Sequence, residues 1–200
     1  VILRLPNDHT NGTRPGGPRP EASVADNDLA VGRVAEAVSH SVYWDDTAIF
    51  ILEDDAQDGP DHVDAHRSPA LVISKYSPGS PGNPFVDHGF YTTVNMVRTM
   101  EELLGLPPMN NNDAVAAPMA PLFSGGENQP PFTADRRNHN NGRIYLVNSG
   151  NGPGAKESAN MDFSHADAAD AHALNAILWR ERKGNIPMPP PKHLVITGGD

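Results

Sequence analysis

The chain has 200 residues, of which 38% are hydrophobic, and its formal net charge is −10 at pH 7. This length suits one ordinary domain or a large part of a bigger one, and the dense apolar runs argue against wholesale disorder. The acidic balance argues against a nucleic-acid binder, because such a protein needs a basic face for the phosphates. No run approaches the roughly 18 apolar residues that a membrane-spanning helix requires.

Glycine and proline occur 18 and 20 times, which indicates long loops, and cysteine is absent. Neither a disulfide framework nor a thiolate zinc site can therefore form. Residues 1–5 (VILRL) are a strand-like apolar run that begins at the first residue, without a signal peptide before it. We expect an interior strand there, and we expect the chain to be the C-terminal part of a longer protein.

Helices and strands alternate along the chain. A cap at Asp26 or Asn27, followed by an apolar stripe, predicts a first helix that ends near residue 38. Continuous apolar runs at residues 47–52 and 69–74 predict strands, and the first run is typical of a strand buried on both faces. A second helix is expected over residues 91–104, because Gly105 and two prolines stop it.

The second half of the chain is poorer in regular structure. Residues 107–160 are rich in Asn, Pro and Gly, and only residues 143–147 resemble a strand. A last helix is predicted over about residues 166–183, with Leu174 and Ile177 on its apolar face. Strands interleaved with helices predict an α/β fold with a mainly parallel sheet that is covered by helices.

Acidic residues and histidines gather directly after the most hydrophobic strand. Residues 53–67 (EDDAQDGPDHVDAHR) hold six acids and two histidines. Ligands bind parallel sheets at the carboxyl ends of strands, and adjacent carboxylates such as Asp54 and Asp55 repel each other unless a cation is present. His62 and His66 add nitrogen donors that suit zinc, manganese or iron. The sequence therefore predicts a divalent metal site, with calcium as a further candidate ion.

Two standard metal motifs do not fit this segment. An EF-hand that starts at Asp54 would place Ala56 and Ala65 at ligand positions. His62 and His66 have the spacing of a zincin helix, but Val63 stands where that motif has its glutamate.

Other candidates have plainer interpretations. His40 suits the carboxyl end of the first helix, and Trp44 and Trp179 suit packing. Residues 150–154 are expected to be a flexible loop, because no P-loop Lys-Ser/Thr and no helix start follow. The remaining histidines are expected at the surface: His88, His139, His165, His172 and His193.

Several motifs together resemble a known family. They are NDHT at residues 7–10, YWDDTAIFILEDD at 43–55, DHV at 61–63, FYTTV at 90–94 and LGLPP at 104–108. Their order and spacing are similar to those of the bacterial phosphoesterase family, which contains phospholipases C and metal-dependent acid phosphatases within the alkaline phosphatase superfamily. Residues 175–184 resemble the C-terminal stretch of members that also carry an upstream β-propeller.

The resemblance implies an alkaline-phosphatase-like fold and a division of the chain. Residues 1–123 correspond to the C-terminal half of the catalytic domain, and residues 124–160 form a loop-rich insertion without a counterpart. Residues 161–200 correspond to the C-terminal helix and proline-rich tail of the same domain. The family also implies a periplasmic or secreted location.

The implied activity is hydrolysis of a phosphomonoester or phosphodiester through a Ser or Thr phosphoenzyme. Asp54 and Asp55 match the acidic pair that binds the catalytic metal. His9 matches an active-site histidine, and His62 matches the histidine of the DHV motif. Asp8 and His66 are further candidate ligands if the site holds two metals.

One departure from the family concerns the nucleophile. In the family it lies in the N-terminal half of the catalytic domain, and Thr10 is the only hydroxyl beside the NDHT motif here. The chain alone is therefore expected to be nearly inactive. The alternative function is a non-catalytic binding or assembly module that keeps a residual or structural metal site.

Overall fold

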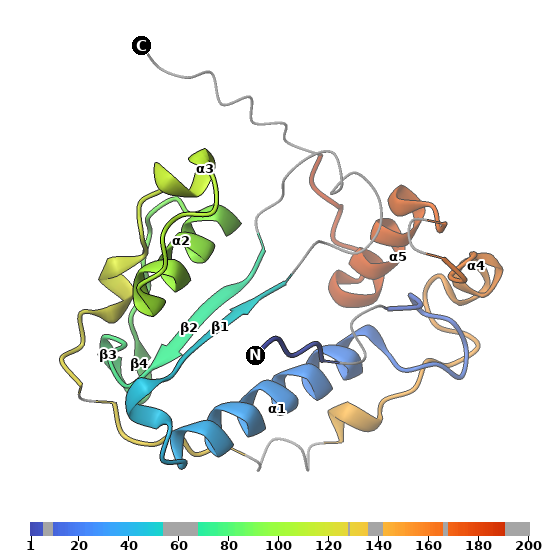
Figure 1. Ribbon diagram of the computed structural model, residues 1–200. Helices are drawn as coiled ribbons and strands as arrows, with labels where there is room; N and C mark the ends of the chain where they lie inside the picture. Colours follow the sequence, from blue (N-terminus) through green and yellow to red (C-terminus); the bar gives the residue numbers. More distant parts are fainter. Residues whose placement is uncertain (6–9, 54–67, 128, 136–141, 166–167, 191–200) are drawn as a thin grey trace. The chain divides into compact units, whose positions relative to one another are not determined.

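The structure, a computed structural model, shows a mixed α/β fold with two small antiparallel sheets (Figure 1). It clusters into two compact units: unit 1 holds the described residues of 1–28 and 142–190, and unit 2 those of 29–53 and 68–135. The described residues are 1–5, 10–53, 68–127, 129–135, 142–165 and 168–190.

The helices are α1 (Pro20–Ser39), α2 (Thr93–Leu104), α3 (Asn111–Ala114), α4 (Ala155–Asn160) and α5 (Ala171–Lys183). Short 3₁₀ helices lie at η1 (Trp44–Asp46), η3 (Ala120–Phe123) and η5 (Arg143–Tyr145). The strands are β1 (Ala48–Leu52), β2 (Ala70–Ser74), β3 (Gly79–Ser80) and β4 (Asn83–Pro84).

Helix α1 begins at Pro20, earlier than the predicted cap at Asp26 or Asn27. A proline suits the first helical position, because its φ is already helical and its missing N–H would have no partner there. The buried residues of the helix are small, Ala22, Ala35 and Ser39, whereas the larger aliphatic side chains are half-buried or exposed. The proline-rich loop therefore leads directly into the helix.

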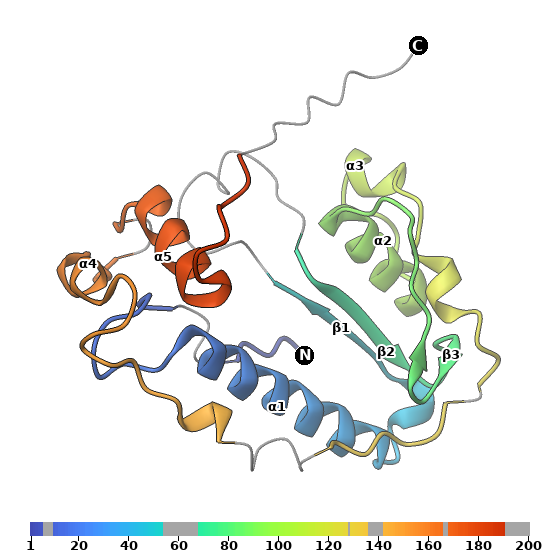
Figure 2. The same ribbon diagram turned by 180° about the vertical axis from the view of Figure 1, so that it is seen from behind.

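Strands β1 and β2 form at the two predicted apolar runs, but they pair antiparallel, from Ala48 opposite Ser74 to Leu52 opposite Ala70 (Figures 1 and 2). The mainly parallel sheet predicted from the sequence is not found among the described residues. The apolar run predicted burial on both faces, yet β1 is only half-buried and Leu52 is exposed. Half-covered strands are typical of antiparallel pairs.

A tight hairpin follows β2. Strands β3 and β4 pair Gly79 with Pro84 and Ser80 with Asn83, which leaves Pro81 and Gly82 as the turn. The φ of Gly82 is +80°, and a type II turn requires this at its third position, after a proline with a fixed negative φ. A Cβ at Gly82 would have no atom within 4 Å, so the tip of this hairpin is open.

Helix α2 confirms the predicted stop at Gly105, which adopts a φ of 65° as the left-handed cap. Its buried residues are Met96, Thr99 and Glu101, while Leu104 is exposed and Val94 is at the border of exposure. The inner face is thus partly polar. The Thr99 hydroxyl donates to the Asn95 carbonyl at 2.6 Å and accepts from the Met119 N–H at 2.8 Å. These bonds fix the chain after α3 to the helix.

The rest of unit 2 is held to α1 and β2 by bonds to backbone. The Ser39 hydroxyl donates to the Phe132 carbonyl and accepts from the Phe132 N–H, at 3.3 and 2.8 Å. The Gln129 amide donates to the carbonyls of Ser77 and Gly79, and the buried Trp44 indole donates to the Gln129 carbonyl. Residues 129–135 therefore run along the other elements of the unit rather than away from them.

Unit 1 is organised around buried polar groups as much as around apolar ones. The Thr13 hydroxyl donates to the Pro153 carbonyl at 2.7 Å, and the Thr13 N–H donates to the Ser158 hydroxyl at 3.0 Å. The buried Asn148 amide donates to the carbonyls of Gly12 and Pro18. These bonds join loops that are more than a hundred residues apart in the sequence.

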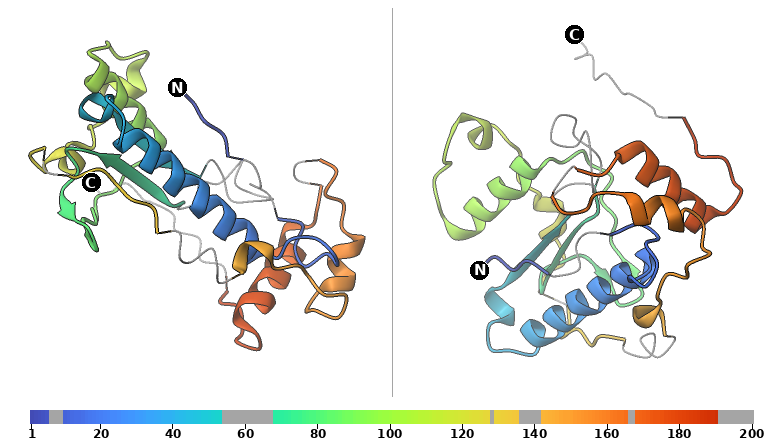
Figure 3. Two further views of the ribbon diagram at one scale, coloured as in Figure 1. Left: turned by 90° about the horizontal axis from the view of Figure 1, so that it is seen from below. Right: turned by 90° about the vertical axis from the view of Figure 1, so that its right-hand side faces the viewer.

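Helix α5 supplies the apolar core of unit 1 beside α4 (Figure 3). Leu174 and Ile177 are each 1% exposed, as the predicted apolar face of the last helix requires. The helix starts later than predicted, because the Asp170 carboxylate accepts from the Ala173 N–H and so caps it.

Two predicted strands do not form. Residues 1–5 adopt no regular structure, and Val1, Ile2 and Leu3 are exposed. Residues 143–147 begin as η5, and only Val147 makes a β-bridge, to Pro18. An apolar run becomes a strand only when a neighbouring strand accepts its backbone bonds, and a run of residues does not specify that neighbour.

The close approach at Gly12 gives a test of unit 1. Gly12 and Gly16 both have positive φ, but a Cβ on Gly12 would lie 2.6 Å from the Ser158 hydroxyl, whereas a Cβ on Gly16 would meet nothing within 4 Å. We expect Gly16→Ala to cost about 1–2 kcal/mol of backbone strain. Gly12→Ala should cost a further 1–3 kcal/mol or so from overpacking. Urea unfolding followed by circular dichroism measures both; equal losses would contradict the packing account.

Candidate functional site

The six residues predicted to form the metal site lie outside the described residues. They are Asp8, His9, Asp54, Asp55, His62 and His66. The prediction that Asp54 and Asp55 share a cleft with His9 and His62 accordingly stays a prediction.

The residues on either side of the acid-rich segment 54–67 are described, and backbone hydrogen bonds join them. Strand β1 ends at Leu52, opposite Ala70, and the next backbone bond runs from the Glu53 N–H to the Pro69 carbonyl at 3.3 Å. The chain therefore enters and leaves residues 54–67 at the same end of the β1–β2 pair. This closure places both flanks of the segment at the carboxyl end of β1. Because the strands are antiparallel, this is also the amino end of β2, so the edge of parallel carboxyl ends from which the sequence predicts the site is not found among the described residues.

Elsewhere, the described residues contain no group of three or more His, Asp or Glu side chains that could hold a metal ion. Thr10, the hydroxyl beside the NDHT motif, accepts a hydrogen bond from the Gly12 N–H at 3.1 Å. This bond gives Thr10 a local structural role in the turn that leads to Gly12.

The plainer interpretations of other residues can be compared with the structure. His40 directly follows α1, and its N–H donates to the Glu36 carbonyl at 3.1 Å, as expected for a residue at a helix end. Trp44 is buried, and the half-buried Trp179 donates from its indole to the Ile186 carbonyl. Of the histidines predicted at the surface, the described ones are exposed: His88, His165 and His172.

A buried carboxylate pair was not predicted from the sequence. Glu101 on α2 and Asp113 on α3 are 5% and 2% exposed, and both accept from the Met109 N–H, at 3.2 and 3.0 Å. Asp113 also accepts from the Asn110 N–H at 2.9 Å. On the other side of Glu101, the Arg98 guanidinium donates at 3.3 Å. The pair fixes the connection between α2 and α3.

Burial alone would raise the pKa of Asp113, because it disfavours the charged carboxylate. The donors at Asn110 and Met109, together with the Glu101 side chain, outweigh burial and hold the pKa below its ordinary value. A signal for this residue exists in the sequence: Asn110 and Asp113 have the spacing of a capping box, which the structure forms.

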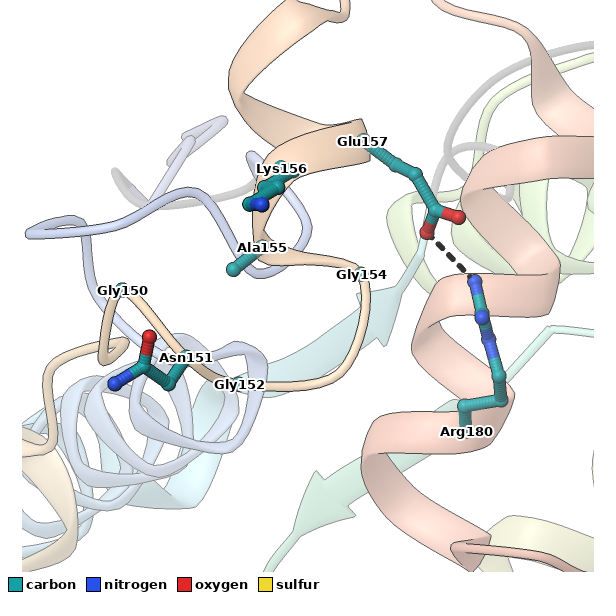
Figure 4. A pocket seen from close by; sticks show the side chains of 8 residues that line it. All are labelled: Gly150, Asn151, Gly152, Gly154, Ala155, Lys156, Glu157 and Arg180. Carbon is teal, nitrogen blue, oxygen red and sulfur yellow. Dashed lines mark hydrogen bonds and ion pairs between the residues drawn. The ribbon is translucent and has the colours of Figure 1, made fainter.

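A shallow pocket of about 370 Å³ lies in unit 1, between α5 and the glycine-rich loop before α4 (Figure 4). Its wall contains Asn151, Gly152 and Lys156, and on the other side the Arg180–Glu157 ion pair at 2.8 Å. Contrary to the sequence analysis, a helix does start after residues 150–154, because Gly154 adopts a φ of 69° and leads into α4. Helix α4 has only six residues, and Arg180 already has a carboxylate partner.

Comparisons with known proteins return nothing: no family model, no curated protein and no solved structure matches the chain. The resemblance to the bacterial phosphoesterase family therefore rests on the sequence motifs alone. In the part of the chain that the structure describes, no helix is both long and apolar enough to cross a membrane.

Acid titration tests the carboxylate pair. Because the pKa of Asp113 is lower in the folded than in the unfolded chain, its ionisation stabilises the fold above about pH 4, near the ordinary value for Asp. This contribution is lost as the pH falls through the lower folded pKa. We expect Asp113→Asn to lower Tm at pH 6 and to reduce the loss of Tm between pH 6 and pH 3.

The control is Asp28→Asn, since Asp28 is an exposed acid on α1. Its melting curves should keep the acid dependence of the original chain. If Asp113→Asn and the original chain lost Tm in parallel over this pH range, Asp113 would not contribute as described.

Proposed function

We propose that the chain belongs to a metal-dependent phosphoesterase of the bacterial phosphoesterase family, within the alkaline phosphatase superfamily. The observation that carries the proposal is the position of the acidic pair. Asp54 and Asp55 follow β1 in the sequence, and the Glu53–Pro69 bond brings both flanks of the acid-rich segment to that end of the strand pair.

Several of the matched motifs coincide with regular elements of the structure. β1 occupies the AIFIL part of the first long motif, and α2 with its left-handed Gly105 occupies the FYTTV-to-LGLPP region. α5 contains most of residues 175–184. The proposal of the family itself rests on the order and spacing of these motifs in the sequence.

The proposed fold is alkaline-phosphatase-like, with β1 and β2 as an antiparallel addition to a mainly parallel sheet. Large α/β sheets often carry such a strand at their edge. The proposed organisation is that given by the resemblance: the C-terminal half of the catalytic domain over residues 1–123, an insertion over 124–160, and the C-terminal helix and tail over 161–200. By the same resemblance, the protein acts in the periplasm or outside the cell.

In this proposal, the chain supplies a site that binds a divalent cation and, next to it, the phosphate group of the substrate. Asp54 and Asp55 would hold a divalent cation, since carboxylate and imidazole donors suit zinc, manganese, iron or calcium. A cation bound there stabilises charge on the phosphoryl group and lowers the pKa of an oxygen nucleophile. The net charge of −10 would otherwise repel a phosphate ester.

The histidines have separate proposed roles. His9 and His62 would contact the phosphoryl oxygens or move a proton during transfer, and Asp8 and His66 would complete a second metal position. By resemblance, the Ser or Thr nucleophile belongs to the N-terminal half of the catalytic domain, which residues 1–123 do not match. Thr10 is not assigned that role.

Metal binding by the chain itself is the first test. Titration calorimetry with Mn²⁺ or Zn²⁺ should detect a site, and Asp54→Asn or Asp55→Asn should weaken it by more than the roughly 10–100-fold that loss of an outer hydrogen-bond partner costs. The matched control is Asp46→Asn, because Asp46 is an exposed acid at the other end of β1. If all three variants bound the metal equally well, Asp54 and Asp55 would not be its ligands.

Hydrolysis is the second test, in a protein that joins this chain to the N-terminal half of the catalytic domain. An aryl phosphate or phosphodiester should be hydrolysed, a chelator should stop the reaction, and a transition metal should restore it. Asp54→Asn should abolish turnover, and His66→Ala should reduce it less. Metal binding without hydrolysis would favour the non-catalytic module, and full activity of Asp54→Asn would refute the proposed site.

A further inference from the structure

Asn-Gly pairs occur three times in the chain, at residues 11–12, 141–142 and 151–152. In such a pair the glycine nitrogen can attack the side-chain amide carbon of the asparagine, because no glycine side chain obstructs it. Asparagine is for this reason among the residues lost from thermostable proteins. Asn141 lies outside the described residues, so the comparison is between the pairs at Asn11 and Asn151.

The pair at Asn151 is open. Asn151 is exposed in the glycine-rich loop, and its side chain makes no hydrogen bond with any described residue. In Figure 4 its amide reaches none of the other labelled side chains. The Gly152 N–H donates to the Ser149 carbonyl over a long 3.3 Å, and a Cβ on Gly152 would have its nearest contact at 3.5 Å. The backbone there has room to rotate.

In the pair at Asn11, the glycine is fixed by hydrogen bonds and close packing. Gly12 is buried, its N–H donates to the Thr10 hydroxyl at 3.1 Å, and its carbonyl accepts from the Asn148 amide at 3.3 Å. The space beside its Cα is filled by Ser158 and Leu174, whose atoms would lie 2.6 and 3.1 Å from a Cβ. Rotation of the Gly12 peptide towards the Asn11 side chain would break these contacts.

We propose that Asn151 is a deamidation site of the folded protein and that the packing of Gly12 protects Asn11 from the same reaction. The Gly152 nitrogen loses its proton and forms a bond to the Asn151 Cγ, the Cγ–Nδ2 bond breaks, and the departing NH2 group takes up a proton from solvent and leaves as ammonia. Water then opens the cyclic imide at either carbonyl, which gives aspartate or isoaspartate at position 151. The only co-reactant is water.

The product changes the pocket in two ways. A carboxylate at position 151 adds a negative charge to a wall that already contains Glu157, beside Lys156 and Arg180. Isoaspartate also adds a methylene to the backbone just before Pro153 and Gly154. The Pro153 carbonyl accepts from the Thr13 hydroxyl at 2.7 Å, and a Cβ on Gly154 would lie 2.7 Å from Ile177. Isoaspartate therefore strains the contacts that join α4 to the rest of unit 1.

Peptide mapping by mass spectrometry, with an isoaspartate-specific methyltransferase as second readout, tests the proposal on the folded chain. We expect Asn151 to convert severalfold faster than Asn11 in buffer, and the two rates to converge in concentrated urea, where packing is lost. Equal rates in the folded chain, or an equally large difference in urea, would overturn the structural explanation.

Two alanine variants sharpen the test. Gly152→Ala fits the loop, since its nearest contact is 3.5 Å, and it should slow conversion of Asn151 about tenfold, as a barrier higher by roughly 1.4 kcal/mol does. Gly150→Ala is the matched control, because a Cβ there meets nothing within 4 Å and Gly150 precedes the reacting pair. Unchanged conversion in Gly152→Ala, or equal slowing in both variants, would contradict attack by the Gly152 nitrogen.

Discussion

The antiparallel pairing of β1 with β2 is the constraint on which the proposed function depends. Five residue pairs align the strands, and the Glu53–Pro69 bond continues the ladder by one step beyond Leu52 and Ala70. This ladder brings the two flanks of the acid-rich segment to one end of the strand pair. Carboxylates that gather in one place repel each other, and a bound cation relieves that repulsion.

The packing of unit 2 follows from the same strand pair. Phe50 on β1 meets Phe123 with ring centroids 6.1 Å apart and planes tilted by 47°, a favourable geometry for two aromatic rings. Lys75, directly after β2, accepts the Gln129 N–H with its carbonyl. Beyond these contacts the unit buries Trp44, Met96 and Met119 together with hydrogen-bonded side chains. The buried polar ones are Ser39, Thr99, Glu101 and Asp113.

Local signals in the sequence predicted much of the secondary structure. The apolar runs gave both β1 and β2, Gly105 marked the end of α2, and the spacing of Leu174 and Ile177 marked the inner face of α5. The predicted parallel direction was wrong for β1 and β2. An apolar run indicates burial, but it does not specify which neighbouring strand accepts its backbone hydrogen bonds or in which direction that strand runs. The predicted start of α1 was wrong because it relied on a polar cap at Asp26 or Asn27, whereas a proline such as Pro20 is compatible with a first helical turn.

In the candidate site too, the residue types could be selected from the sequence, whereas their arrangement in space could not. The acidic pair and the histidines were selected by residue type and by resemblance, and their arrangement depends on contacts that the sequence does not encode locally. The buried Asp113 was overlooked within a stretch rich in Asn and Pro. Its capping-box spacing with Asn110 was present, but burial of the carboxylate depends on α2, whose Glu101 shares the Met109 N–H.

The loops of unit 1 differ in kind from the turn between β3 and β4, and this has a consequence for how the chain can change in length. Gly12, Pro18 and Pro153 supply carbonyls to buried donors, so an inserted residue within 12–18, or directly before Pro153, would shift an acceptor out of reach. The Pro81–Gly82 turn is not constrained in this way, because a Cβ on Gly82 would meet no atom within 4 Å. Insertions, affinity tags and natural length variation therefore belong at the Pro81–Gly82 turn, whereas the proline- and glycine-rich loops of unit 1 must keep their length.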